Sequence, residues 1–263
     1  MNRNHLRSAR SATRLTAAPG LGALARLGVA TGLALAWTSG AGAAAQSGDA
    51  LARAVEDALD DERALRRLEV SVAGSEVTLS GSLRNFWEKS EALRIAFDVE
   101  GVETVASEIE IPEPEDDQEL ANEVGRQITR YPFYTMWDVI NGRVDDGVVR
   151  LRGLVTPIRD KAGELFERIA KIPGVQDIQM DIRPLSPSSG DARIRSIISR
   201  QLARNTHFER FARMRNPPFH IIVNNSLATL IGYVQGEIER MELQRIVAQT
   251  PGVLRVDNQL QTR

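Results

Sequence analysis

A pattern that occurs three times constrains the fold of this chain more than any other feature. Each copy begins with alternating apolar residues that end at a glycine, continues through a helical stretch, and closes on Gly-Val-x-x-Val or Gly-Val-x-x-Ile. The two glycines of a copy are 20, 21 and 20 residues apart, and they are Gly81 and Gly101, Gly153 and Gly174, and Gly232 and Gly252. Because a fixed internal spacing is typical of a duplicated structural unit, we expect three similar small domains.

The apolar residues around these glycines predict one order of elements. In the first copy, helical spacing at 51–59 precedes two alternating strands at 68–72 and 77–79, followed by a helix at 86–97 and a strand at 102–111. A strand, a crossover helix and another strand of one sheet favour a parallel, right-handed connection. Both helices must then cover one face to bury their apolar stripes. The predicted fold class is α+β, with three tandem αββαβ domains, each a three-stranded mixed sheet covered on one face by two helices.

The domain organisation follows from the repeat and from two linkers. The first linker is acidic and contains proline, and the second is richer in turn formers, which predicts a more flexible connection. The predicted segments are a signal peptide at 1–45, domain 1 at 46–112, the acidic linker at 113–117, domain 2 at 118–183, the Pro/Ser linker at 184–190, and domain 3 with a basic insertion at 191–263.

Several helix starts can be predicted from capping residues. Asn85 with Glu88 three residues later forms a capping box. We expect Asp49, Thr156 and Asp191 to be N-caps of other helices, with a proline after Thr156 in the first-turn position that proline prefers.

The repeated pattern of strand, glycine, helix, Gly-Val and strand, preceded by a helix and a first strand, resembles the BON domain, the small envelope module of osmotically inducible periplasmic proteins. The resemblance covers nearly everything after residue 48 and suggests three tandem copies. It implies a periplasmic or outer-membrane-associated protein linked to osmotic and envelope stress, which contacts phospholipid or assists other proteins. The motif consists of glycines and aliphatic residues, so it is specific for a fold and carries no chemistry.

The N-terminal segment is typical of a secretory signal peptide. Residues 1–26 contain five arginines and no acidic residue, residues 27–37 are uncharged and apolar, and Ala-x-Ala sites follow. We expect cleavage after Ala45, or else after Ala43, and therefore a periplasmic location. An uncleaved anchor or an organellar transit peptide would also suit such a leader. The chain has no cysteine, so a lipobox, a disulfide and a thiolate nucleophile are excluded.

The sequence offers few groups for catalysis. His207 and His220 are the only histidines after the leader, and their spacing suits neither a metal site nor a nucleophile–base pair. The Asp145-Asp146 pair is typical of a hairpin turn. No glycine-rich phosphate loop occurs, because the repeat glycines follow strands singly. We therefore expect no enzyme, no cofactor and no metal site.

Charge is distributed unevenly among the copies. Residues 46–112 hold 7 basic and 15 acidic residues, residues 113–187 hold 10 and 14, and residues 188–263 hold 11 and 6. The candidate lipid-binding residues lie in the basic third copy and are Arg200, Arg204, Phe208, Arg210, Phe211, Arg213 and Arg215. Guanidinium groups would pair with phosphates while Phe208, Phe211, Met214 and Phe219 enter the headgroup boundary. Alternatively, the phenylalanines pack under the sheet, and the arginines cover a solvated face or contact the acidic first domain.

These observations lead to two functional predictions. The first is an exported protein that binds an envelope component, with anionic phospholipid as the preferred ligand. By analogy with relatives in which phospholipid contact is ascribed to the first helix of a domain, the matching place is the first helix of the third copy and its arginine-rich extension. The second is a soluble periplasmic chaperone or scaffold that binds client proteins. Export argues against nucleic acid as a partner, and the oligomeric state is left open.

Overall fold

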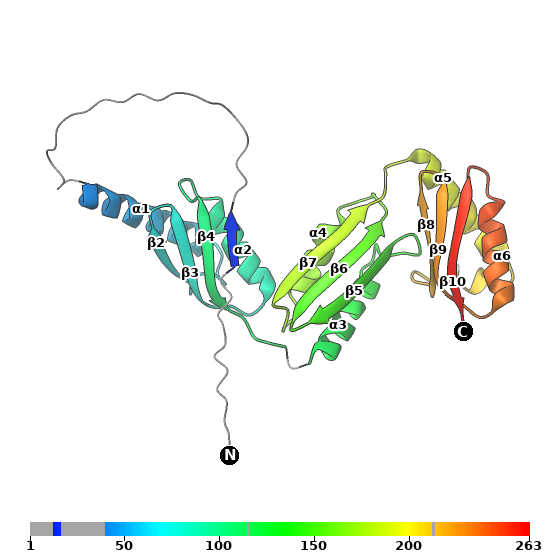
Figure 1. Ribbon diagram of the computed structural model, residues 1–263, viewed down its shortest axis with the longest axis horizontal. Coiled ribbons are helices and arrows are strands. Elements are labelled where there is room, and N and C mark those ends of the chain that lie inside the picture. The colour runs from blue at the N-terminus through cyan, green and yellow to red at the C-terminus, as the bar shows by residue number, and fades with distance from the viewer. Residues whose placement is uncertain (1–12, 17–39, 115, 212–213) are drawn as a thin grey trace, which may run out of the picture. The chain divides into compact units, whose positions relative to one another are not determined.

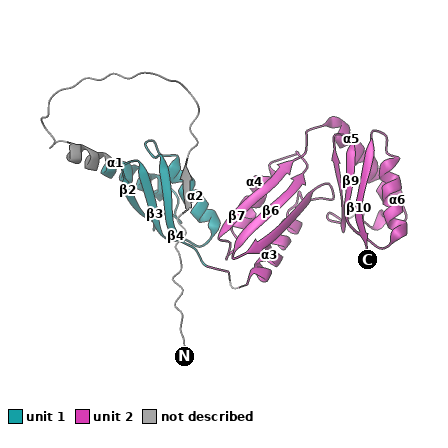
Figure 2. Ribbon diagram, viewed as in Figure 1, with its two compact units in different colours: residues 1–112 teal, residues 113–263 magenta. Residues whose placement is uncertain are grey.

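The computed structural model describes residues 13–16, 40–114, 116–211 and 214–263, with side chains from Gly48 onward (Figure 1). The chain divides into two compact units, Met1–Pro112 and Glu113–Arg263 (Figure 2). The predicted signal peptide lies almost wholly outside the described residues. Export and cleavage near Ala45 therefore stay predictions.

The first unit contains the first repeat. Its elements are β1 (Thr13–Thr16), α1 (Gly40–Asp60), β2 (Glu69–Ala73), β3 (Glu76–Ser82), α2 (Phe86–Phe97) and β4 (Thr104–Glu110). The strand order is β1-β4-β3-β2, and β3 runs antiparallel to β2 and parallel to β4. The capping box is confirmed, because the Glu88 amide donates to Asn85 Oδ1 at 3.0 Å. Asp49 is not an N-cap, since α1 is already continuous from Gly40.

The second unit contains the second and third repeats. The second repeat is built from α3 (Asp117–Arg130), β5 (Val139–Asp145), β6 (Val148–Val155), α4 (Lys161–Ala170) and β7 (Asp177–Pro184). The third is built from α5 (Ser189–Arg204), the short 3₁₀ helix η1 (Glu209–Phe211), β8 (Phe219–Asn224), β9 (Leu227–Val234), α6 (Glu237–Ala248) and β10 (Arg255–Thr262). Their strand orders are β5-β6-β7 and β10-β9-β8.

The three repeats share one topology, which confirms the predicted α+β fold, although β1 adds a fourth strand beside β4 to the first sheet. In each, the second strand is central, antiparallel to the first and parallel to the third. The strand pairing explains why glycine is required at the repeat positions Gly153 and Gly232. A Cβ at Gly153 would clash with the backbone oxygen of Val139, and one at Gly232 would clash with that of Pro218. The start of the first strand therefore passes so close to the central strand that a side chain does not fit.

Each core lies between the sheet and its two helices. In the first repeat it includes Val55, Leu59, Val77, Leu79, Ala92 and Val105. In the third it includes Ile194, Ile198, Leu202, Ile221, Leu230, Leu243 and Val247. In the second repeat the predicted stripe of Leu120, Val124 and Ile128 is buried. The helical members of each core recur at intervals of three or four residues, which is why these segments form amphipathic helices.

The second and third repeats contact one another within their unit. Ile222 of β8, on the sheet face opposite the helices, packs with Val139 and with Leu185, which is 2% exposed. The Ile221 amide on the edge of β8 donates to the Met136 carbonyl at 2.7 Å, and so this point of the edge is paired. The linker at 184–190 is thus held against the third sheet, in contrast to the flexible connection that its composition suggests.

Candidate functional site

The connector between α5 and β8 places the predicted aromatic residues inside the third repeat. Phe208 is 0% exposed, and its ring lies 5.8 Å from that of Phe219 and 6.3 Å from that of Phe211. The rings of Phe211 and Phe219 are 5.2 Å apart in an edge-to-face arrangement. Phe208, Phe211 and Phe219 therefore form core and do not reach a lipid surface in this fold. Among the predicted apolar anchors with a described side chain, Met214 is exposed, at 49%.

Arg210 also has an internal role. Its guanidinium group donates to Glu239 Oε1 at 2.5 Å and lies 4.5 Å from the centroid of the Phe211 ring. The other carboxylate oxygen of Glu239 accepts the Gln235 amide at 2.9 Å at the start of α6. Arg210 thus fixes the connector to the N-terminus of α6, and its charge is matched by a carboxylate that is mostly buried.

The other predicted arginines whose placement is described are exposed. Arg200 and Arg204 lie on α5, Arg215 follows η1, and Arg213 is outside the described residues. Arg193, which the sequence reasoning did not select, lies seven and eleven positions before Arg200 and Arg204, and so all three share one side of the helix. That side is opposite the buried stripe of Ile194, Ile198 and Leu202. We call Arg193, Arg200 and Arg204 the arginine face of α5.

The arginine face of α5 differs from the surfaces of the neighbouring helices. In α2, α3, α4 and α6 a basic side chain pairs with a carboxylate three or four residues away, for example Arg94 with Glu91 and Arg245 with Glu242. Within the described part of the chain, no arginine of α5 makes an ion pair with a carboxylate. Arg200 instead donates to Ser196 Oγ at 2.7 Å. The positive charge of this face is therefore not neutralised within the described protein.

The acidic residue of α5 has another role. The N-cap is Ser188, whose hydroxyl accepts the Asp191 amide at 3.1 Å, so the prediction of Asp191 as N-cap is wrong. The Asp191 carboxylate accepts the amides of Asn225 and Ser226 in the β8–β9 turn at 2.8 and 2.9 Å. Both turn residues have positive φ, which turns their amides toward the helix. Asp191 therefore joins the first helix of the repeat to its hairpin.

The second repeat contains the same contact between an aspartate of its first helix and the amides of its hairpin turn, which we call the aspartate clamp. Asp117, at the matching position of α3, accepts the amides of Asp146 and Gly147 at 2.7 and 2.9 Å. The prediction of a hairpin turn at Asp145-Asp146 is confirmed. The sequence reasoning missed this contact. Its signal is an Asp three positions before the first apolar residue of the helix, a position that Gly48 occupies in the first repeat.

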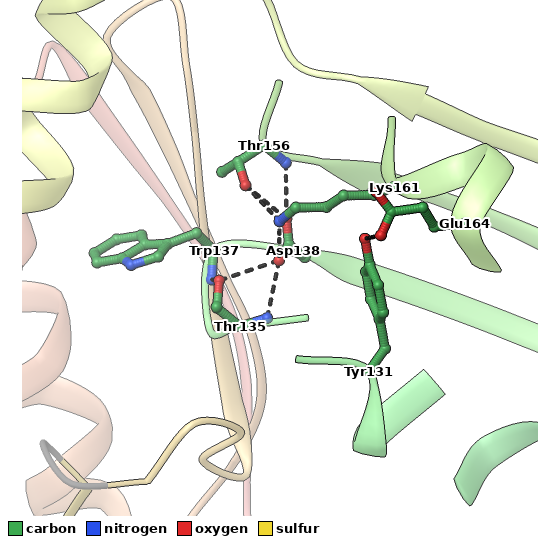
Figure 3. Close-up of polar contacts among 7 residues, drawn as sticks. All are labelled: Tyr131, Thr135, Trp137, Asp138, Thr156, Lys161 and Glu164. Atoms are coloured by element: carbon green, nitrogen blue, oxygen red, sulfur yellow. Dashed lines mark hydrogen bonds and ion pairs between the residues drawn. The ribbon is translucent and has the colours of Figure 1, made fainter. Parts of the chain in front are cut away.

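A buried ion pair closes the second repeat (Figure 3). Asp138 is 0% exposed and Lys161 is 1% exposed, and the Lys161 ammonium lies 2.8 Å from both carboxylate oxygens. Thr135 and Thr156 each donate an amide and a hydroxyl to Asp138. Every donor of the ammonium is satisfied, because Thr156 Oγ1 accepts its third hydrogen bond at 2.7 Å. The prediction of Thr156 as a helix cap is wrong, since α4 begins at Lys161 after the N-cap Asp160.

This network holds the segment that contacts the third repeat. Figure 3 shows Trp137 directed away from Asp138, and both Met136 and Trp137 pack against the core of the third repeat. His220 of β8 lies beside Tyr134, with ring centroids 5.6 Å apart. Desolvation lowers the pKa of His220 and raises that of Tyr134 to about 12, because burial disfavours the charged form of each. Desolvation and the hydrogen bond to Glu164 also raise the pKa of Tyr131.

The arrangement is suited to packing rather than to chemistry. The Asp138–Lys161 pair is closed to solvent, so a substrate has no access to it. Among the residues with described placement, no group of three His, Cys, Asp or Glu side chains could hold a metal ion. His207 is exposed and His220 is held at the contact between repeats. None of the described helices is long and apolar enough to cross a membrane.

Comparison with known families identifies the fold. The BON domain family model matches residues 47–113 and 190–263, which together make up more than half of the chain. The chain belongs to the BON family. The two matched segments are the first and third repeats. The second repeat has the strand order and pairing of these two BON repeats, and its membership of the family stays a prediction.

Other comparisons with this BON protein gave weaker matches. No curated protein matches the chain. Solved structures that match include the C-terminal domain of CdsD, a structural protein of the type III secretion system of Chlamydia trachomatis, at 14% identity with a TM-score of 0.24. That match covers 81% of this chain and 97% of the other. A second structure of CdsD matches at 15% identity with a TM-score of 0.24, covering 81% and 93%.

Proposed function

We propose that this protein is an exported, non-enzymatic BON-repeat protein that binds anionic phospholipid surfaces of the envelope and protects the envelope under osmotic or related stress. The arginine face of α5 carries this proposal. Three guanidinium groups share one side of a helix, and no described carboxylate neutralises them. Anionic headgroups supply the phosphates that such a face would pair with.

The position of the arginine face suits a flat surface. Arg193, Arg200 and Arg204 project from the side of α5 opposite its buried stripe, and Arg215 and Met214 are exposed beyond the C-terminal end of the helix. Phe208 and Phe211 are in the core, so the contact would be mainly electrostatic. Binding of this kind is weakened by salt over the range in which the Debye length shortens to a few ångströms.

The test is co-sedimentation of residues 46–263, which retain every described side chain, with vesicles of neutral or anionic phospholipid. We expect recovery with anionic vesicles only, and less recovery at high salt. Arg193→Gln, Arg200→Gln and Arg204→Gln together should weaken binding roughly a hundredfold, since each basic residue near such a surface contributes about 1 kcal/mol.

The matched control is the triple variant Arg126→Gln, Arg240→Gln and Arg245→Gln. It changes the net charge by the same amount but removes arginines that already pair with carboxylates. This variant should retain most of the binding. Equal recovery on neutral and anionic vesicles, or equal loss in both variants, would contradict the proposal and favour a scaffold that binds client proteins.

A further inference from the structure

The open face of the second sheet carries a second group of arginines, which lies outside the lipid contact proposed above. Arg143 of β5 is directly opposite Arg150 of β6 in the strand register, and Arg152 follows two residues later on the same face. This face is not covered by α3 or α4. A shallow hollow of about 560 Å³ lies over it and is lined by Asn141, Arg143, Arg150, Arg152, Gln179 and Asp181 among others. We call Arg143, Arg150 and Arg152 the arginine cluster of the second sheet.

The cluster is only partly neutralised by the protein. Arg150 donates to Gln179 Oε1 at 2.9 Å and lies 3.6 Å from an oxygen of Asp145. Asp181 is opposite Arg152 in the register, but its carboxylate accepts from Arg183 Nε at 2.7 Å. Arg143 and Arg152 are exposed and make no ion pair with any described carboxylate. Like charges directly opposite each other in a sheet are destabilising, so the cluster does not serve the stability of the sheet.

The same three positions differ in the other repeats. Counted from each hairpin turn, they are Ser71, Thr78 and Ser80 in the first repeat and Ile222, Thr229 and Ile231 in the third. In the third repeat the two isoleucines are covered by Val139 and Leu185. The open face of a sheet in this chain therefore already serves as a contact surface, and its side chains match what covers it. Arginines at these positions indicate a ligand with negative charge.

The chemistry of the face selects the kind of anion. Guanidinium groups present paired donors that match phosphate oxygens, and Asn141 and Gln179 add neutral amides at the margin. Protein interfaces place apolar side chains at their centre, but the centre of this face is charged. The apolar side chains in the lining of the hollow are Leu151, which is buried, and Met180, which is partly exposed, so the hollow offers little apolar surface for insertion into a bilayer. We propose that the arginine cluster of the second sheet binds a water-soluble ligand with two or more closely spaced phosphoryl groups.

The test is isothermal titration calorimetry of residues 46–263 with inorganic tripolyphosphate and, separately, with inorganic phosphate. We expect binding of tripolyphosphate that is at least about tenfold tighter than binding of phosphate, because several guanidinium groups then contact one ligand. Arg143→Gln with Arg152→Gln should weaken tripolyphosphate binding by on the order of a hundredfold, since each removes charge-assisted hydrogen bonds. The melting temperature of this variant should not fall, because like-charge repulsion is relieved.

The matched control is Arg193→Gln with Arg200→Gln on α5. This pair should retain tripolyphosphate binding and lose vesicle binding, whereas the sheet variant should do the reverse. Failure of one proposal is thereby distinguished from failure of the other. Tripolyphosphate binding that the sheet variant leaves unchanged would overturn the inference, as would a loss of vesicle binding in that variant. A shift from oligomer to monomer in the sheet variant by analytical ultracentrifugation would also overturn it, in favour of a second copy of this chain as the partner.

Discussion

The second and third repeats close the same connection with different chemistry. In both, the chain must pass from the first helix to the first strand and cover one end of the core. The second repeat does this with the buried side chains of Tyr131 and Tyr134, together with the Asp138–Lys161 ion pair and two threonines. The third does it with the rings of Phe208, Phe211 and Phe219. The fold thus fixes where this connection goes and leaves its chemistry free.

The difference explains why an aromatic, arginine-rich connector resembles a membrane-binding segment in the sequence. Its phenylalanines belong to the core of the third repeat, and Arg210 pairs with Glu239. The arginines that remain available to a ligand are those on the surface that pair with no described carboxylate. This comparison can be tested in residues 46–263 with Trp87→Phe, because Trp137 is then the only tryptophan and its fluorescence reports on the second unit.

The largest effect should come from Phe208→Ala. Removal of a fully buried ring from an aromatic cluster should lower the free energy of unfolding of the second unit by up to about 5 kcal/mol. Urea denaturation followed by Trp137 fluorescence measures it. Met214→Ala removes an exposed side chain of the same connector and should change stability by less than about 0.5 kcal/mol. Comparable losses in the two variants would contradict the assignment of the aromatic side chains to the core.

Breaking the polar connection should cost slightly less. Lys161→Ala leaves the Asp138 carboxylate buried without its cation, and we expect a loss of about 3 kcal/mol by the same measurement. Asp138→Leu combined with Lys161→Met removes both charges and should recover much of this loss, because apolar residues of similar volume can replace a buried pair. A double variant no more stable than Lys161→Ala would show that the threonine contacts to Asp138 dominate.

The two aspartate clamps should have smaller and similar effects. Asp191→Ala removes two hydrogen bonds to turn amides and should lower stability by about 1–2 kcal/mol. Asp117→Ala should do the same in the second repeat. Substitution of Ala192, which is exposed on the same turn of α5, by Ser serves as the control. An effect of Asp191→Ala below that of the control would mean that the β8–β9 turn holds its geometry without the helix.

The smallest effect concerns pH. Desolvation lowers the pKa of His220 in the folded protein, so folding favours the neutral ring. The stability contributed in this way is present above the unfolded pKa near 6.5 and is lost as the pH falls through the folded pKa. The groups beside His220 are the Tyr134 ring, the backbone of Thr135 and Asp138, and the negative charge of Asp138, which opposes the effect of desolvation. Denaturation midpoints should therefore fall with pH less steeply in His220→Phe. Equal slopes in both proteins would exclude this contribution.

Much of the fold could be predicted from the sequence, because its determinants are local and repeated. Spacing alone predicts the helix with the stripe of Leu120, Val124 and Ile128. Spacing also identifies the repeat glycines, which lie close to the backbone of a neighbouring strand. The polar contacts could not. Asp138 and Lys161 are 23 residues apart and belong to no pattern. Asp191 in a first helical turn is equally compatible with capping and with a contact to a distant turn, and only the tertiary structure decides.

The candidate site was predicted in part. Charge counts directed attention to the third repeat, and Arg200 and Arg204 are indeed exposed there. The exposure of an aromatic residue, however, depends on whether the core has room for it, and a longer connector gave Phe208 and Phe211 that room. Arg193 was missed because it lies outside the segment in which arginine and phenylalanine alternate. The arginine cluster of the second sheet is divided between two strands, and only the register brings its members together.

The cover that Val139 and Leu185 place over Ile222 makes the third repeat dependent on what precedes it. Cut away at its linker, the last repeat would present bare isoleucines and an unpaired strand edge to water, where a second molecule could add to them. The repeats are therefore not interchangeable in the chain. A chain rearranged by recombination would lose this junction, and its final module would then expose Ile222.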